Sequence, residues 1–216
     1  YGRLADNAGV HFLGENINYG LATAFNKSVT YAKQAVNDLE GFVFFDQDSE
    51  LTSSNILLLI DEYRFLESNS VPVGVLGAQP INNDGHSYWV RHAKKKTIFS
   101  DRFISAEFVI SSFSLVPMST LNKVGMFDDK LFIDLVDSEF SYRCSKNDLL
   151  NLVSKKIFFP QKNLDQRNTI TDPLVSGVCQ YEELQANLKS LDIGTFELWQ
   201  ISTMSPLTEI ESSKNV

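Results

Sequence analysis

Two carboxylates stand together directly after a buried apolar run. In "FVFFDQDSEL" (residues 42–51), four apolar residues lead straight into Asp46 and Asp48. Side chains alternate along an extended chain, so both carboxylates can face one pocket. Two like charges held close need a cation between them, and Mg²⁺ and Mn²⁺ prefer such oxygen ligands. The spacing favours a divalent-metal site, and the competing interpretation is an acidic turn that caps a helix.

A second acidic cluster lies in "FIDLVDSEF" (residues 132–140). Asp137 and Glu139 are of a type that can take a proton from a hydroxyl group as it attacks another atom. Asp134 and Glu139 fit equally well as capping or solvated charges beside a helix start. Arg143 lies one turn beyond Glu139, so it either pairs with that carboxylate or takes part in function.

Periodicity predicts the elements that must position these carboxylates. Helical spacing of apolar residues covers 19–36 and 56–66, with Thr52 or Ser53 as the cap of the second helix. Strands are predicted at 41–46, 71–81, 107–116 and 152–160, and a short helix at 118–127 is predicted to end near Gly125. This alternation predicts an α/β fold with a largely parallel sheet. Ligands bind such sheets at the carboxyl ends of the strands, where Asp46 and Asp48 fall.

Composition excludes several function classes. A net charge of −8 gives no footprint for nucleic acid. The basic run "RHAKKK" (91–96) predicts either a solvated loop or a contact with an anionic surface such as a membrane or a phosphate-bearing acceptor. Two cysteines and three histidines without ligand spacing predict neither a disulfide framework nor a zinc site. With no apolar run of about 20 residues, we expect a cytoplasmic protein, either free or peripheral at the inner face of the membrane.

Several stretches together resemble one enzyme family. They are "NYGLATAFN" (18–26), "FVFFDQDSEL", "VISS" (109–112), "VGMFDD" (124–129) and "LFIDLVDSEFSYR" (131–143). In this order they resemble family 2 glycosyltransferases of the GT-A fold, and most of all the bacterial rhamnosyltransferase-like branch. The resemblance implies a GT-A domain over residues 1–160, with a mostly parallel central sheet flanked by helices. Residues 161–216 would then form a short C-terminal helical extension and tail.

The resemblance also implies an activity. Members of this family transfer a sugar from a nucleotide-diphosphate donor, and the branch implies an inverting, metal-dependent enzyme that acts on a lipid-linked or growing surface polysaccharide. dTDP-rhamnose fits the branch as donor, while UDP-galactofuranose and other UDP-hexoses are donors of near relatives. Two other classes stay open: a non-catalytic sugar-nucleotide-binding domain, and a nucleotidyltransferase, although no glycine-rich basic phosphate loop is visible.

Site residues carry over by the same resemblance. Asp48 would ligate Mn²⁺ or Mg²⁺ directly, and Asp46 would lie nearer the ribose or the water shell of the metal. Asp137 aligns with the catalytic base, and Glu139 is the reserve candidate. The remaining candidates are Asp6, Asn7, Gly20 and Asn26 on the donor side, and Ser111, Ser112 and Trp89 on the acceptor side, where Trp89 would stack on a sugar ring.

Departures from the family pattern carry information of their own. Only Leu4 and Ala5 separate "YGR" from "DNAG", which leaves no room for the helix and strand of the family, so we expect nucleotide-binding segments to be missing there and again after Gly9. Phe113 stands where the family has a glycine, and it either narrows the acceptor side or packs in the core. Towards the C-terminus, 179–191 predicts an amphipathic helix and 195–204 an apolar segment; these either cover the acceptor site or form a contact between subunits.

Overall fold

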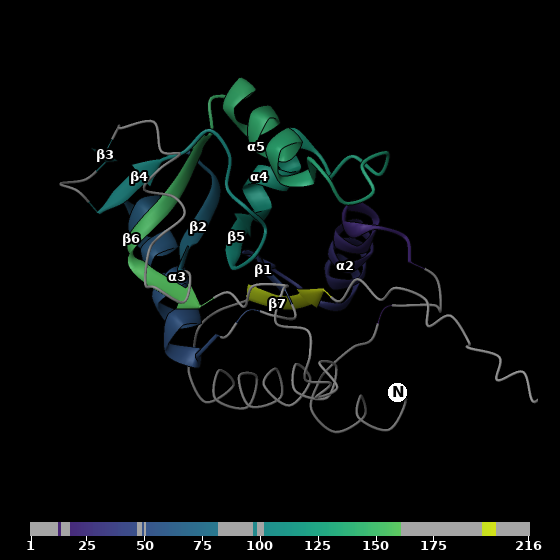
Figure 1. Cartoon of the computed structure of the whole chain (residues 1–216), viewed down its shortest axis with the longest axis horizontal. Helices are drawn as coiled ribbons and strands as arrows, with labels where there is room; N and C mark the ends of the chain where they lie inside the picture. Colours follow the sequence, from purple (N-terminus) through teal and green to yellow (C-terminus); the bar gives the residue numbers. More distant parts are fainter. Residues whose placement is uncertain are drawn as a thin grey trace, which may run out of the picture.

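The structure, a computed structural model, describes residues 13, 18–46, 49, 51–81, 97–98, 102–160 and 196–201. Figure 1 shows how the helices and strands are arranged. The helices are α2 (Leu21–Ala35), α3 (Ser53–Ser68), α4 (Met118–Val124) and α5 (Val136–Lys146). The strands are β1 (Gly41–Asp46), β2 (Val73–Ile81), β3 (Thr97–Ile98), β4 (Phe103–Ser105), β5 (Ser114–Pro117), β6 (Leu150–Pro160) and β7 (Phe196–Ile201). The helices predicted around residues 19–36, 56–66 and 118–127 are confirmed.

The strands form one seven-stranded sheet in the order β3-β4-β6-β2-β5-β1-β7. Only the β1–β7 and β2–β6 pairings are parallel, and all other neighbours run antiparallel. The prediction of a largely parallel sheet is therefore wrong, since the sheet is mixed. The main reason is β5, which enters between β1 and β2 and runs against both of them.

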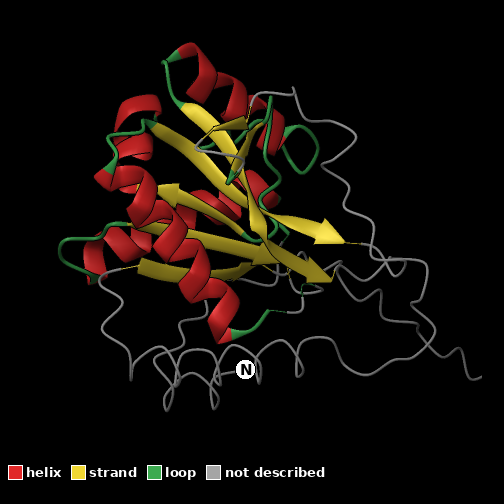
Figure 2. Cartoon of the chain, turned by 90° about the vertical axis from the view of Figure 1, so that its left-hand side faces the viewer, coloured by secondary structure: helices red, strands yellow, loops and turns green. Residues whose placement is uncertain are grey.

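The sheet is covered by helices on both faces, as Figure 2 shows. One core contains the side of α3 that carries Ile56, Leu59 and Leu66, packed against Val43 and Phe45 of β1. The other contains α2, α4 and α5 and packs against the opposite side of β1. Continuous burial of β1 on both faces explains why its sequence is an unbroken apolar run.

Strand β7 extends the sheet with residues from the segment after residue 160. Residues 196–201 pair in parallel with β1 at the edge of the sheet, from Gly41 opposite Phe196 to Asp46 opposite Ile201. Part of the segment that was assigned to a helical extension after residue 160 therefore belongs to the sheet. The amphipathic helix predicted at 179–191 and the basic run at 91–96 lie outside the described residues. No helix among the described residues has the length and apolar character needed to cross a bilayer.

A buried carboxylate joins three separate elements on the α3 side. Glu62 of α3 is completely buried. Its Oε2 accepts a hydrogen bond from Nε of Arg102 at 2.7 Å, and Nζ of Lys156 in β6 lies 3.7 Å from Oε1. The Arg102 guanidinium also lies over the ring of Phe65, 3.7 Å from its centroid. A buried carboxylate is tolerated only when cations lie this close.

Gly20 allows α2 to begin against the loop that precedes α5. Its φ is +82°, and a Cβ there would collide with the carbonyl oxygen and ring of Phe132. That carbonyl oxygen accepts a hydrogen bond from the backbone N–H of Leu21 at 2.5 Å, which satisfies one of the free N–H groups of the first helical turn. Glycine is needed here for both its backbone conformation and its size.

We expect Gly20→Ala to lower the free energy of unfolding by roughly 2–3 kcal/mol or more, because it adds a steric clash to a backbone conformation that alanine avoids. Urea denaturation measures the loss. Gly125→Ala is the matched control, since φ is +86° there but an added Cβ would meet only the Arg143 guanidinium at 3.9 Å. If both variants lose the same free energy of unfolding, the segment around Phe132 can move away from an added Cβ at residue 20.

Candidate active site

The candidate site lies beside the C-terminal end of β1, at the end of the sheet rather than along its edge strands. Because β5 is antiparallel to β1, the residues that lead into β5 lie at this same end, with Ser114 opposite Phe44. The predicted strand over 107–116 is wrong in its first part: residues 107–113 are irregular, and regular pairing begins at Ser114. Antiparallel entry thus brings Ser111 and Ser112 to the end of β1.

Phe113 explains why the strand starts late. Its φ is +52°, a left-handed conformation that bends the chain and that glycine adopts most easily. The side chain is fully buried, and its ring meets Phe159 of β6 edge-on, with centroids 5.5 Å apart. Phe113 was expected either to narrow the acceptor side or to pack in the core, and the structure shows core packing. Burial of the ring helps to offset the strained backbone.

Ser49 links the end of β1 to Ser112. The backbone N–H of Ser49 donates to the carbonyl oxygen of Asp46 at 3.2 Å, and its hydroxyl lies 2.8 Å from the hydroxyl of Ser112. Both serines are buried. Asp48 directly precedes Ser49 in the chain but lies outside the described residues. Ser49 was not among the predicted site residues, although its place after the paired aspartates was a usable signal.

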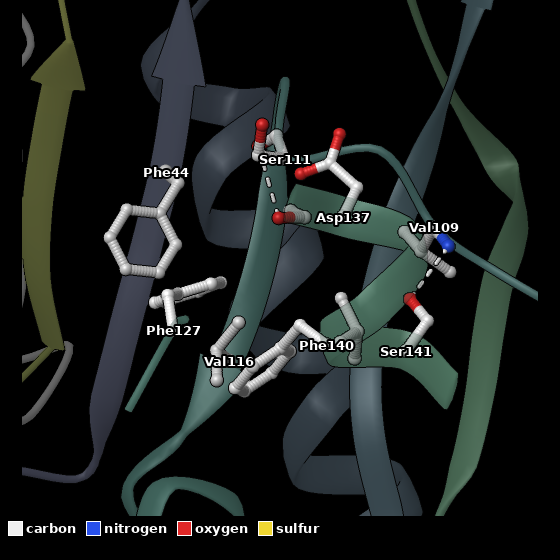
Figure 3. A pocket seen from close by; sticks show the side chains of 10 residues that line it. Phe44, Val109, Ser111, Val116, Phe127, Asp137, Phe140 and Ser141 are labelled. Atoms are coloured by element: carbon white, nitrogen blue, oxygen red, sulfur yellow. Dashed lines mark hydrogen bonds between the residues drawn. The ribbon is translucent and has the colours of Figure 1, made fainter. Parts of the chain in front are cut away.

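Asp137 meets the other serine of the pair. It lies in the first turn of α5, and its half-buried carboxylate lies beside Ser111, whose backbone N–H and hydroxyl act to lower its pKa. Figure 3 shows this carboxylate turned towards Ser111, above a group of apolar side chains. Asp137 and Ser111 line a cavity of about 10 Å³, about the size of one water molecule. Its lining includes Phe44, Phe127 and Phe140.

The surroundings of Asp137 favour its protonated form. Burial raises the pKa of this carboxyl above its usual range, and the N–H and hydroxyl of Ser111 oppose that rise. The position in the first turn of α5 also favours the charged form through the helix dipole. A carboxylate with a raised pKa is a better proton acceptor, which suits general base chemistry.

Buried polar contacts fix α5 relative to the sheet. The Ser141 hydroxyl accepts a hydrogen bond from the Val109 backbone N–H at 3.1 Å, a contact drawn in Figure 3. Asn151 of β6 donates to the carbonyl oxygen of Ser141 at 2.8 Å and to the hydroxyl of Ser145 at 3.1 Å. The helix that carries Asp137 is therefore held against both β6 and the segment that contains Ser111.

Glu139, the reserve candidate, is bound to Arg143. The guanidinium contacts both carboxylate oxygens, at 2.5 and 2.8 Å, and also donates to the carbonyl oxygens of Val124 and Met126. For Arg143 the structure shows the pairing alternative, a cross-link between α5 and the end of α4. Glu139 is thus bound in an ion pair, and Asp137 stays the first candidate for the base.

Two donor-side candidates make structural contacts. The Asn26 amide donates to the carbonyl oxygen of Phe127 at 2.8 Å and to the Asp129 carboxylate at 2.5 Å, and its oxygen accepts from the Phe127 N–H. Gly20 provides the close approach to Phe132 described above. Both residues hold α2 to the segment between α4 and α5. Their part in donor binding stays a prediction.

Three more of the predicted site residues, Asp6, Asn7 and Trp89, lie, like Asp48, outside the described residues. Asp46 is half-buried at the end of β1. Among the described residues, no three carboxylate, histidine or cysteine side chains gather closely enough to hold a metal ion. The metal site predicted at Asp46 and Asp48 stays a prediction.

Comparison with known proteins gives one informative match. No family model matches the chain. A dTDP-rhamnosyl transferase, RfbF of Shigella flexneri, is 29% identical over 150 residues. The match covers 66% of this chain and 48% of the relative, so the chain spans about half the length of the curated protein it matches. Over the matched residues, the chain is thus similar to a sugar transferase.

Proposed function

We propose that this chain is part of a glycosyltransferase that moves a sugar from a nucleotide-diphosphate donor to a glycan or lipid-linked acceptor. The observation that carries the proposal is the position of Asp137. Its carboxylate lies beside Ser111, with which it lines one cavity, near the end of β1 where "DQDS" begins. The distant similarity to a dTDP-rhamnosyl transferase supports the same function.

The proposed reaction inverts the anomeric centre and uses one carboxylate as base. Asp137 would accept the proton from the acceptor hydroxyl as its oxygen attacks the anomeric carbon, while the bond from that carbon to the donor phosphate breaks. Burial supports this role because it raises the proton affinity of the carboxylate. The rigid attachment of α5 through Ser141 and Asn151 would keep the base at a fixed distance from the donor.

The residues of the "DQD" motif have the chemistry for a divalent metal. Asp46 and Asp48 offer hard oxygen ligands of the kind that Mg²⁺ and Mn²⁺ bind together with substrate phosphates. When bound, the ion would neutralise the charge that develops on the diphosphate leaving group. The hydrogen bond from Ser49 to Asp46 and the contact of Ser49 with Ser112 support a fixed backbone on either side of Asp48.

The loop before Asp137 suits an acceptor with an apolar part. Phe132, Ile133 and Leu135 all expose their side chains, and Leu135 is 68% exposed. Leu135 also has a φ of +67°, a strained conformation that non-glycine residues keep mainly where the surroundings require it. These features support a lipid-linked acceptor beside the base.

A panel of nucleotide sugars tests the donor. We expect dTDP-rhamnose with Mn²⁺ to raise the melting temperature by several degrees at saturating concentration, since a ligand that binds only the folded state stabilises it. dTDP alone should give much of the shift, because the base and diphosphate carry most of the polar contacts. Differential scanning fluorimetry with and without EDTA measures the effect.

The controls separate the alternatives. Stabilisation by UDP but not by dTDP would move the donor to UDP-galactofuranose or a UDP-hexose. Stabilisation by a nucleotide sugar without turnover on any acceptor would favour a non-catalytic sugar-nucleotide-binding domain. If no nucleotide sugar stabilises the protein, the proposed function is wrong.

A further inference from the structure

Exposed apolar side chains gather around the start of α5. Six large apolar side chains are exposed among the described residues, and four of them form a group that we call the apolar patch: Phe132, Ile133, Leu135 and Tyr142. Leu135 is the N-cap of α5, and Tyr142 lies about two turns further along, on the same side of the helix. Single exposed apolar residues are normal on a protein surface, whereas a group of neighbours marks a surface that contacts a partner.

The loop that carries most of the apolar patch is held in place by α2. The carbonyl oxygen of Phe132 accepts a hydrogen bond from the Leu21 N–H, and the Asp129 carboxylate accepts one from the Asn26 amide. Figure 1 shows this loop between α5 and α2. Because the loop is anchored at two points, its apolar side chains are kept in solvent by the fold.

Leu135 is unfavourable in two ways for the isolated protein. Its backbone has a left-handed φ of +67°, which leucine rarely adopts, and its side chain is the most exposed of the apolar patch. Glycine or asparagine would fit this backbone better, and a polar side chain would fit the exposure better. A contact outside the chain explains an apolar residue at this position.

We propose that the apolar patch docks on the surface of a lipid bilayer, with its side chains at the boundary between headgroups and hydrocarbon. Asp137 lies in the first turn of α5, directly after the patch, so docking would bring the proposed base to an acceptor carried by the membrane. This catalytic consequence rests on the proposed function. The docking itself does not, because it is a property of the surface.

The charges around the apolar patch are complementary to a zwitterionic headgroup. Lys130 and Lys146 are exposed and suit a lipid phosphate, and the Lys146 ammonium lies 5.2 Å from the centre of the Tyr142 ring. Asp134, exposed in the same loop, suits the ammonium group of phosphatidylethanolamine. Lysine and tyrosine both combine an apolar body with a polar end, as residues at a membrane boundary do. Since both signs of charge are present, we expect no preference for anionic lipid.

Co-sedimentation with vesicles of phosphatidylethanolamine and phosphatidylcholine tests the docking. We expect the wild type to bind, and Ile133→Asn and Leu135→Asn each to weaken binding by roughly five- to tenfold, as for the loss of one buried apolar side chain. Binding should persist at about 1 M salt, where charges are screened beyond about 3 Å. Leu135→Asn should also raise the melting temperature by about 2–4 °C, because asparagine tolerates the left-handed backbone.

Phe158→Asn is the matched control, since Phe158 is a large exposed side chain on β6, outside the apolar patch. Its vesicle binding should equal that of the wild type. No binding by the wild type, or an equal loss in Phe158→Asn, would disprove the docking. Binding that requires anionic lipid and disappears in high salt would assign the contact to a basic surface and would also disprove it. Vesicle binding without stabilisation by any nucleotide sugar would support the docking and refute the proposed function.

Discussion

Asp137→Asn is expected to lower turnover by about 10²- to 10⁴-fold, the usual contribution of a general base. The amide keeps the size of the carboxylate, but it cannot take the acceptor proton. Donor affinity should change little, because the lost interaction belongs to the transition state. Steady-state kinetics beside a donor-binding titration measures both quantities.

Glu139→Gln is the matched control on the same helix. Its carboxylate is bound by the Arg143 guanidinium, so the change should weaken that ion pair and leave turnover within a few-fold of wild type. If Glu139→Gln loses the turnover and Asp137→Asn does not, the assignment of the base is reversed. If neither variant loses more than a few-fold, the acceptor proton is taken elsewhere and the inverting mechanism proposed here is wrong.

The same Asp137→Asn variant should be more stable than the wild type at neutral pH. Burial raises the pKa of this carboxyl in the folded state, so the folded protein holds its proton more strongly than the unfolded chain does. Ionised Asp137 therefore destabilises the fold above its folded-state pKa, and this penalty vanishes below the unfolded-state pKa. Denaturation curves should show the gain at pH 7 and its loss at acid pH. Equal stability at both pH values would show that the carboxylate is well solvated.

Asp48→Asn is expected to reduce Mn²⁺-dependent binding of the nucleotide diphosphate by about a hundredfold or more, since a direct metal ligand contributes at least as much as the groups around it. EDTA should abolish activity of the wild type, and excess Mn²⁺ should restore it. Isothermal titration with the nucleotide diphosphate, with and without Mn²⁺, measures the loss.

Asp61→Asn serves as the control for charge alone. It removes one negative charge from an exposed position on α3, outside the "DQD" motif. We expect its Mn²⁺ dependence to equal that of the wild type. Full activity of Asp48→Asn, or of the wild type in EDTA, would remove the metal from the mechanism.

Local signals in the sequence predicted helices α2, α3 and α4 and the buried strand β1 well. Thr52 caps α3 through a hydrogen bond from the Asn55 N–H, and the predicted apolar face of that helix is buried. Gly125 ends α4 with a φ of +86°. Such features depend on neighbours within one or two turns, so they can be identified without knowledge of the fold.

Features that depend on distant pairing were missed. The apolar stretch from 107 to 116 has the composition of a strand, but the left-handed bend at Phe113 and the antiparallel entry of β5 are set by contacts with β1 and β2. The pairing of β7 with β1 joins segments about 150 residues apart in the chain, and no local pattern encodes such a pairing. Phe113 at a position typical of glycine was the one local sign of the bend.

The candidate site was predicted in part for the same reason. Asp137 could be selected from its motif, but its contact with Ser111 requires the loop before β5 to lie over the first turn of α5. Ser49 was missed because its role depends on Ser112, 63 residues further along the chain. Residue types and short spacings indicated the candidate catalytic groups, while their neighbours came from the tertiary structure.

The buried carboxylate of Glu62 gives the sheet a means of rejecting a misaligned strand. Its compensating cations come from the residue before β4 and from the middle of β6, so it is neutralised only when both strands are in their native alignment with α3. A one-residue shift of β6 that brings Ile157 to the position of Lys156 would place an apolar side chain there instead. The carboxylate would then be left with Arg102 alone, in a site that water does not reach. The buried charge of Glu62 thus penalises this wrong alignment of β6 during folding.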